Sequence, residues 1–111
     1  MTEPMQPPVE EADVRDVAAA LPIDGDAVLI DVRETWEWQT GHAGGAQHIP
    51  LKELPARLEE LPRTAPVYLI CASGTRSGKA AQYLKQAGFE RPIYVRGGTV
   101  AWEREGLPMS R

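Results

Sequence analysis

Three short, unbroken apolar runs constrain the fold of this chain most strongly. They cover residues 27–30, 67–70 and 93–95. A strand with one face in water alternates apolar and polar residues, whereas a strand covered on both faces can be apolar throughout. The segments between the runs are long enough for crossovers that contain helices. The runs therefore predict the central strands of a parallel β-sheet that is covered by helices on both faces.

The intervening segments carry the patterns of helices and of shorter strands. Apolar spacing predicts helices over residues 12–21, 34–39, 51–60, 77–87 and 99–105. Two short strands are expected, at the sheet edge over 9–12 and before Pro50 over 47–49. We place Pro55 in a first helical turn and expect Gly88 to end the helix at 77–87. This alternation predicts an α/β fold of three layers with right-handed crossovers.

The length and the N-terminal composition indicate one domain with a short tail. A chain of 111 residues fits a single domain. Residues 1–8 hold three prolines and little to bury, so we expect a flexible tail there and one folded domain over 9–111.

The overall charge and hydropathy exclude several classes of protein. The net charge is −4 and the pI is about 5.1, whereas nucleic-acid binders usually carry a basic face. No apolar run approaches the roughly 18 residues of a membrane span, and the acidic N-terminus lacks the pattern of a signal peptide. One cysteine allows no internal disulfide, which fits a reducing compartment. We therefore expect a cytoplasmic protein that binds neither nucleic acid nor membrane.

Polar and glycine-rich residues follow each of the three apolar runs. They are Asp31-Val32-Arg33, the segment from Cys71 to Arg76, and Arg96-Gly97-Gly98. In parallel α/β sheets, sites lie beyond the carboxyl ends of the strands, near a switch in strand order. If the strands are parallel, these three segments meet at one edge of the sheet.

Cys71 is the candidate reactive residue. It leaves a strand, and a helix follows it after a short loop, so unpaired backbone N–H groups with partial positive charge should face its thiol. Residues 61–89 hold four basic and no acidic side chains, while the rest of the chain holds 8 basic and 16 acidic ones. Both features predict a positive local potential, a lowered thiol pKa and an anionic substrate.

Several other chemistries of a lone cysteine are disfavoured. One cysteine and two histidines lack the paired spacing of a zinc site, and there is no second cysteine for a dithiol redox pair. We interpret His42 and His48 as surface or turn residues rather than as the base of a catalytic pair. No cofactor-binding glycine motif is present, so we expect neither a metal nor a cofactor.

A thiolate in a cradle of N–H groups can accept either a phosphoryl group or a sulfane sulfur. Cysteine phosphatases place five residues between the cysteine and the arginine of this loop. Here four residues, 72–75, lie between Cys71 and Arg76. The smaller cradle favours a terminal sulfur atom and disfavours a phosphatase or an arsenate reductase.

The chain resembles a single-domain rhodanese, a sulfurtransferase, over nearly its whole length after the tail. The resemblance lies in three groups of residues with the family's order and spacing. They are Asp31-Val32-Arg33-Glu34, Trp36-Glu37, Gly41-His42, Gly45-Ala46 and Ile49-Pro50; then Cys71, Gly74, Arg76 and Ser77; then Gly97-Gly98, Ala101-Trp102 and Gly106-Leu107-Pro108. The resemblance implies a rhodanese-like fold, a five-stranded parallel sheet in the order 3-2-4-5-1 flanked by helices.

The resemblance also implies a mechanism. Cys71 would take the outer sulfur of thiosulfate, or of a related persulfide or polysulfide donor, and pass it to cyanide, a cellular thiol or a protein acceptor. Residues 72–76 would bind the substrate: Ala72, Ser73, Gly74, Thr75 and Arg76. Asp31, Arg33, Ser77, Gly97 and Gly98 would support the loop, and Trp102 would pack in the core.

The residues leave a second interpretation open. The chain could be a persulfide carrier or redox-sensing module that serves a protein partner and turns over small molecules weakly. Within the resemblance, Ala43 and Gln47-His48 depart from the family's usual residues, but they lie in the framework. The variable loop interior does not identify the sulfur donor.

Overall fold

The computed structural model describes residues 8–22 and 25–111. Within them, five strands form a parallel sheet in the spatial order β1-β6-β5-β2-β4. These strands are β1 (Glu10–Ala12), β2 (Val28–Asp31), β4 (Ala46–His48), β5 (Val67–Ile70) and β6 (Pro92–Val95). Numbered along the chain, this is the order 3-2-4-5-1, so the predicted topology is confirmed. No helix of the described residues is long and apolar enough to cross a membrane.

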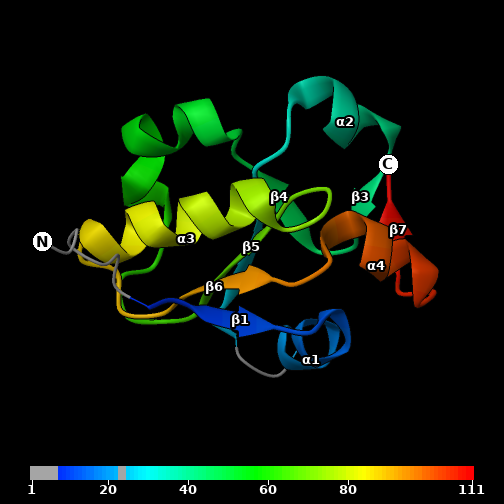
Figure 1. Cartoon of the computed structure of the whole chain (residues 1–111), viewed down its shortest axis with the longest axis horizontal. Helices are drawn as coiled ribbons and strands as arrows, with labels where there is room; N and C mark the ends of the chain where they lie inside the picture. The colour runs from blue at the N-terminus through cyan, green and yellow to red at the C-terminus, as the bar shows by residue number, and fades with distance from the viewer. Residues whose placement is uncertain (1–7, 23–24) are drawn as a thin grey trace, which may run out of the picture.

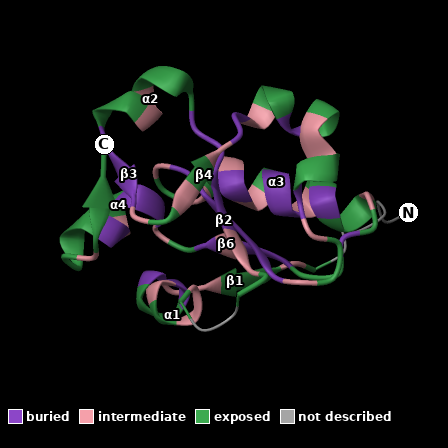
Figure 2. Cartoon of the chain, turned by 180° about the vertical axis from the view of Figure 1, so that it is seen from behind, coloured by how far each residue is buried: buried purple, intermediate pink, exposed green. Residues whose placement is uncertain are grey.

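Helices cover both faces of the sheet, as the unbroken apolar runs require (Figure 1). One face packs against η1 (Leu51–Glu60) and α3 (Thr75–Gln86), and the other against α1 (Val14–Ala20) and α4 (Gly98–Arg104). Every residue of β5 is buried, and Figure 2 shows the buried ribbon concentrated in the central strands. The three-layer architecture is therefore confirmed.

The helices agree with the sequence patterns except at two places. The helix predicted at 77–87 begins at Thr75, because Gly74 takes a φ of +122° and turns the chain directly into the first helical turn. The segment 51–60 forms 3₁₀ turns with a kink at Arg57 rather than one regular helix. Pro55 lies in the middle of this segment, where it lacks an N–H group to donate to the preceding turn.

A second, two-stranded sheet was not predicted. Strand β3 (His42–Ala43) pairs antiparallel with β7 (Met109–Ser110), and α2 (Thr35–Thr40) precedes it. The Gly44 N–H donates to the Pro108 carbonyl at 2.7 Å. Strands of two residues are too short to show a periodic pattern, so only the tertiary structure reveals them.

Seven of the residues in the predicted N-terminal tail, 1–7, lie outside the described residues. Pro8 is exposed, and the first regular element is β1 from Glu10.

Candidate active site

The carboxyl ends of β2, β5 and β6 meet at one edge of the sheet. The Val32 N–H after β2 donates to the Ile70 carbonyl of β5 at 2.9 Å. After β6, the Thr99 N–H donates to the Cys71 carbonyl at 2.8 Å, and the Val100 N–H donates to the Ala72 carbonyl at 3.1 Å. The start of α4 therefore holds the cysteine segment through its backbone.

Gly98 makes this backbone contact possible. Its φ is +58°, in the left-handed region that favours glycine. A Cβ atom at this position would lie 2.5 Å from the Ala72 carbonyl oxygen and closer still to the Cys71 carbonyl oxygen. The two chain segments could not approach each other with any other residue there.

The loop after Cys71 folds around the sulfur atom. Sγ accepts hydrogen bonds from the backbone N–H groups of Gly74 at 3.1 Å and Ser77 at 3.3 Å. The Ser77 hydroxyl lies 3.5 Å from Sγ and 3.1 Å from the Gly74 carbonyl oxygen. The hydroxyl hydrogen can therefore turn from the carbonyl to the sulfur when the thiol ionises. Cys71 is only 1% exposed, so this cradle suits small reagents.

The cradle stabilises the thiolate of Cys71. Burial alone would raise the pKa of the thiol, because it removes the charged form from water. The Ser77 hydroxyl and the N–H groups of Ser77, Gly74 and Ser73 outweigh burial, so the pKa of Cys71 is lowered overall. The sequence also predicted a lowered pKa for Cys71. The contributions that lower it are hydrogen bonds from residues of the loop.

The pH dependence of alkylation tests this stabilisation. We expect the iodoacetamide reaction of Cys71 to titrate below the value near 8.5 of a free thiol. In Ser77→Ala the midpoint should rise, because the variant loses the strongest hydrogen bond to the charged form. The rate is followed by mass spectrometry across the pH range. A wild-type midpoint at or above the free-thiol value would contradict the cradle's role.

Arg76 is paired with a carboxylate that the sequence did not place beside it. Its guanidinium donates to both carboxylate oxygens of Glu37, at 2.7 and 2.9 Å. Hydrogen bonds from Arg76, opposed by burial, lower the pKa of Glu37 to about 2. The pair therefore stays ionised through the neutral range. The region around the loop is less positive than the carboxylate-free segment 61–89 suggests.

Asp31 and Arg33 form a buried ion pair at the end of β2, outside the cysteine loop. The Arg33 guanidinium donates to the Asp31 carboxylate at 2.8 Å and to the Gly41 carbonyl at 2.8 Å. The Arg33 backbone N–H also donates to Asp31, at 2.9 Å. This pair joins the exit of β2 to the end of α2, and α2 carries Glu37.

The interpretation of His42 as a surface or turn residue is wrong. His42 is buried, and its ring stacks on Trp38 with ring centroids 3.4 Å apart. His48 lies on β4. Its ring centroid is 4.9 Å from that of Trp38, and its Nε2 is 2.8 Å from the Arg33 carbonyl oxygen. Both rings therefore fix the framework around α2, because their partners are backbone carbonyls and an aromatic ring.

The remaining predicted loop residues are more exposed than Cys71. Ser73 and Thr75 are exposed, and Ala72 is half-buried. Trp102 is buried and donates from Nε1 to the Pro108 carbonyl at 2.7 Å, so its packing role is confirmed. Among residues 8–22 and 25–111, no cluster of three histidine, cysteine or carboxylate side chains could hold a metal ion.

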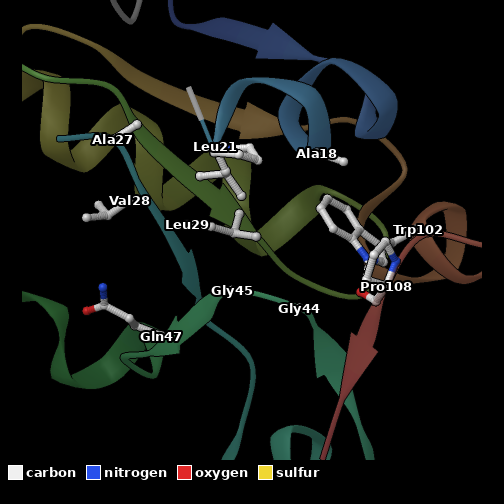
Figure 3. A pocket seen from close by; sticks show the side chains of 11 residues that line it. Ala18, Leu21, Ala27, Val28, Leu29, Gly44, Gly45, Gln47, Trp102 and Pro108 are labelled. Carbon is white, nitrogen blue, oxygen red and sulfur yellow. Dashed lines mark hydrogen bonds between the residues drawn. The ribbon is translucent and has the colours of Figure 1, made fainter. Parts of the chain in front are cut away.

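An apolar pocket of about 390 Å³ lies on the α1 and α4 face of the sheet, away from the cradle. Figure 3 shows Trp102 and Pro108 at one end of it and Val28 near the other. None of residues 71–77 lines this pocket, so it does not serve the cysteine.

Comparisons with known proteins agree with this geometry. The family described as Rhodanese-like domain matches residues 14–105. A sulfurtransferase of Allochromatium vinosum is 37% identical over 101 residues, covering 91% of this chain and 94% of that protein. The thiosulfate sulfurtransferase GlpE of Vibrio cholerae is 35% identical over 94 residues, covering 85% and 89%. The crystal structure of a rhodanese-related protein from Thermoplasma volcanium has a TM-score of 0.79 and 30% identity, covering 91% of this chain and 97% of that one.

Proposed function

The chain belongs to the Rhodanese-like domain family, and we propose that it is a sulfurtransferase that carries sulfur as a persulfide on Cys71. Relatives at 35% and 37% identity are named sulfurtransferases, which supports sulfur transfer as the class of reaction. The observation that carries the proposal is the cradle, in which backbone N–H groups and a hydroxyl surround one sulfur atom at the start of α3.

We propose thiosulfate, or a related persulfide or polysulfide, as the donor. The Cys71 thiolate attacks the outer sulfur of thiosulfate, and a new sulfur–sulfur bond forms. The bond from that outer sulfur to the sulfonate sulfur breaks, and its electron pair leaves with sulfite. The N–H groups that donate to Sγ support this proposal, because such donors stabilise negative charge on the sulfur of the attacking and leaving thiolate. An acceptor such as cyanide or a cellular thiol then removes the outer sulfur and restores the thiolate.

The four-residue loop interior supports sulfur rather than phosphate as the group transferred. The N–H groups of Gly74 and Ser77 already lie 3.1 and 3.3 Å from Sγ. They converge on the cysteine sulfur itself, whereas a phosphate would need donors for three oxygens beyond it. Arg76 lies next to the loop, but it shares its charge with Glu37.

A role as a persulfide carrier is the second candidate, and the single cysteine is equally compatible with it. Because the chain has no second cysteine, the persulfide has no internal thiol that could resolve it. The sulfur must pass to another molecule, which in a carrier is a specific protein. A transfer rate to that protein much faster than to cyanide would identify the carrier role.

Intact-protein mass spectrometry tests the proposed function. We expect a mass gain of one sulfur atom after incubation with thiosulfate, and loss of this gain when cyanide is added. An unchanged mass with thiosulfate, polysulfide and glutathione persulfide would refute sulfur transfer. Hydrolysis of an aryl phosphate that alkylation of the protein blocks would indicate a phosphatase instead.

Replacing Glu37 should strengthen the binding of an anionic donor. In Glu37→Gln the amide keeps the shape and the helix cap, but it no longer neutralises the Arg76 guanidinium. We expect the KM for thiosulfate to fall about two- to fivefold at low salt, and the effect to fade at high salt. Steady-state assays with cyanide as acceptor measure it.

Glu53→Gln is the matched control for this change. It removes the same charge from an ion pair with Arg57 on η1, a segment that holds no cradle residue. Its KM should equal that of the wild type. A KM that stays constant or rises in Glu37→Gln would show that the ion pair between Glu37 and Arg76 does not weaken the binding of thiosulfate.

A further inference from the structure

A groove runs along α3 and begins at Gly74 and Thr75, beside the cradle. It has a volume of about 460 Å³, and its α3 wall consists of Gly74, Thr75, Gly78, Lys79 and Gln82. The four helical positions recur at intervals of three and four, so they form one face of the helix. Val9 and Tyr94, from the chain before β1 and from β6, line the groove too; α3, β1 and β6 lie side by side in Figure 1. We call this the α3 groove.

Gly78 holds the groove open next to the loop. It lies in the first turns of α3 with no positive φ, so the backbone does not require glycine. A Cβ atom built there meets nothing within 4 Å, so packing does not require glycine either. Glycine is less stable than alanine inside a helix. The space above Gly78 is therefore available to a ligand. Ligand binding would explain a glycine at this position, which neither the backbone conformation nor the packing requires.

Two side chains of the groove have polar groups without partners in the described part of the chain. The Lys79 ammonium is exposed and forms no ion pair there, whereas the Lys85 ammonium on the same helix donates to the Glu90 carbonyl. The Gln82 amide oxygen is buried and accepts no hydrogen bond from the described residues. A ligand with a carboxylate would complement the exposed Lys79 ammonium, whereas the buried Gln82 oxygen is not accessible from the groove.

We propose that the α3 groove binds the body of a low-molecular-weight peptide thiol that accepts sulfur from Cys71. This inference rests on the proposed function and names the class of its acceptor. From Thr75 to Gln82 the helix rises about 10 Å, which is the length of an extended dipeptide or tripeptide. The thiol lies at the mouth of the cradle, the backbone passes over Gly78, and a carboxylate faces Lys79.

The transfer balances without any further reagent. The acceptor thiolate attacks the outer sulfur of the Cys71 persulfide, and a sulfur–sulfur bond forms between them. The bond from that sulfur to Sγ breaks, and its electron pair returns to Cys71 as the thiolate held by Gly74 and Ser77. The proton of the acceptor thiol goes to solvent. The outer sulfur of the persulfide lies about 2 Å beyond Sγ, and the groove begins at Gly74 and Thr75 of the same loop.

The test measures how fast a preformed persulfide is discharged by two thiols. Wild-type protein is loaded with thiosulfate, desalted, and mixed with glutathione or with 2-mercaptoethanol, which has no body to fill the groove. In Gly78→Leu we expect the second-order rate with glutathione to fall at least about fivefold, and the rate with 2-mercaptoethanol to stay within about twofold. Gly78→Ala should have a smaller effect, because a methyl group fills less of the space.

Charge is tested on the same helix. In Lys79→Gln the rate of discharge by glutathione should fall about threefold, and the rate with 2-mercaptoethanol should stay unchanged. Lys85→Gln is the matched control: it removes the same charge from α3 outside the groove, and its rates should equal those of the wild type. Equal slowing of both thiols, or no slowing in Gly78→Leu and Lys79→Gln, would overturn the proposal.

The outcomes separate this proposal from the proposed function. Failure of sulfur transfer shows at the loading step, before any acceptor is added. The groove has a readout that needs no chemistry, because S-methylglutathione has no free thiol. Its titration should shift the backbone amide signals of Gly78 and Lys79 in NMR spectra, and unchanged signals would refute the groove as a binding site.

Discussion

The Cys71→Ser variant is expected to take up no sulfur from thiosulfate and to lose sulfurtransferase activity by about 10³-fold or more. A serine hydroxyl can still accept hydrogen bonds from the N–H groups of Gly74 and Ser77, so the cradle keeps its shape. It does not ionise near neutral pH and cannot hold a sulfane sulfur. The variant should therefore be folded, with a free energy of unfolding within about 1 kcal/mol of the wild type.

Mass spectrometry and thermal unfolding check both halves of this expectation. Because Cys71 is the chain's only cysteine, wild-type protein blocked with iodoacetamide provides a second control without any substitution. It should match the variant in activity. Sulfur uptake by a stable, folded Cys71→Ser protein would mean that another group accepts the sulfur.

Gly98→Ala is expected to combine a large loss of stability with a large loss of activity. The new methyl group would overlap the Ala72 carbonyl oxygen, at 2.5 Å, and the Cys71 carbonyl oxygen. To relieve this overlap, α4 and the loop must separate, and the hydrogen bonds from Thr99 and Val100 are weakened. We expect the free energy of unfolding to fall by about 3 kcal/mol. Sulfur uptake should slow about 100-fold, because the cradle shifts against its helix.

Gly106→Ala separates backbone strain from this overlap. Gly106 also has a positive φ, of +71°, but a Cβ atom there meets nothing within 4 Å. This variant should lose about 1 kcal/mol from strain alone and keep its activity. Urea unfolding and persulfide formation are measured for both proteins. Equal losses in the two variants would show that the contact between α4 and the loop does not matter.

Much of the fold could be predicted because its signals are local. The apolar runs at 67–70 and 93–95 became β5 and β6, and their parallel direction follows from the crossover between them, whereas the strand order was implied by the resemblance. The 3₁₀ turns of η1 and the kink at Arg57 were not anticipated, because Pro55 was expected in a first helical turn and instead lies in the middle of the segment. The pairing of β3 with β7 joins segments more than 60 residues apart and has no periodic signal.

In the candidate site too, local features could be predicted from the sequence, and features that depend on tertiary contacts could not. Gly74 and Ser77 lie within six residues of Cys71, so their approach to the sulfur is a property of one loop and is visible in the spacing. The burial of His42 depends on the ring of Trp38 and on the strand at the C-terminus. Histidine occurs both at surfaces and in packed frameworks, and its residue type alone does not separate the two.

By itself, the sequence determined that a lone cysteine leaves a buried parallel strand, enters a four-residue loop and meets the start of a helix. These are consequences of local patterns and of strand direction. Only the tertiary structure decided the charge around that loop, because Glu37 reaches Arg76 across 39 positions of the chain. The packing of α2 and the buried pair of Asp31 and Arg33 bring the two together. An electrostatic field sums over distance in space, and the order of residues along the chain does not contain those distances.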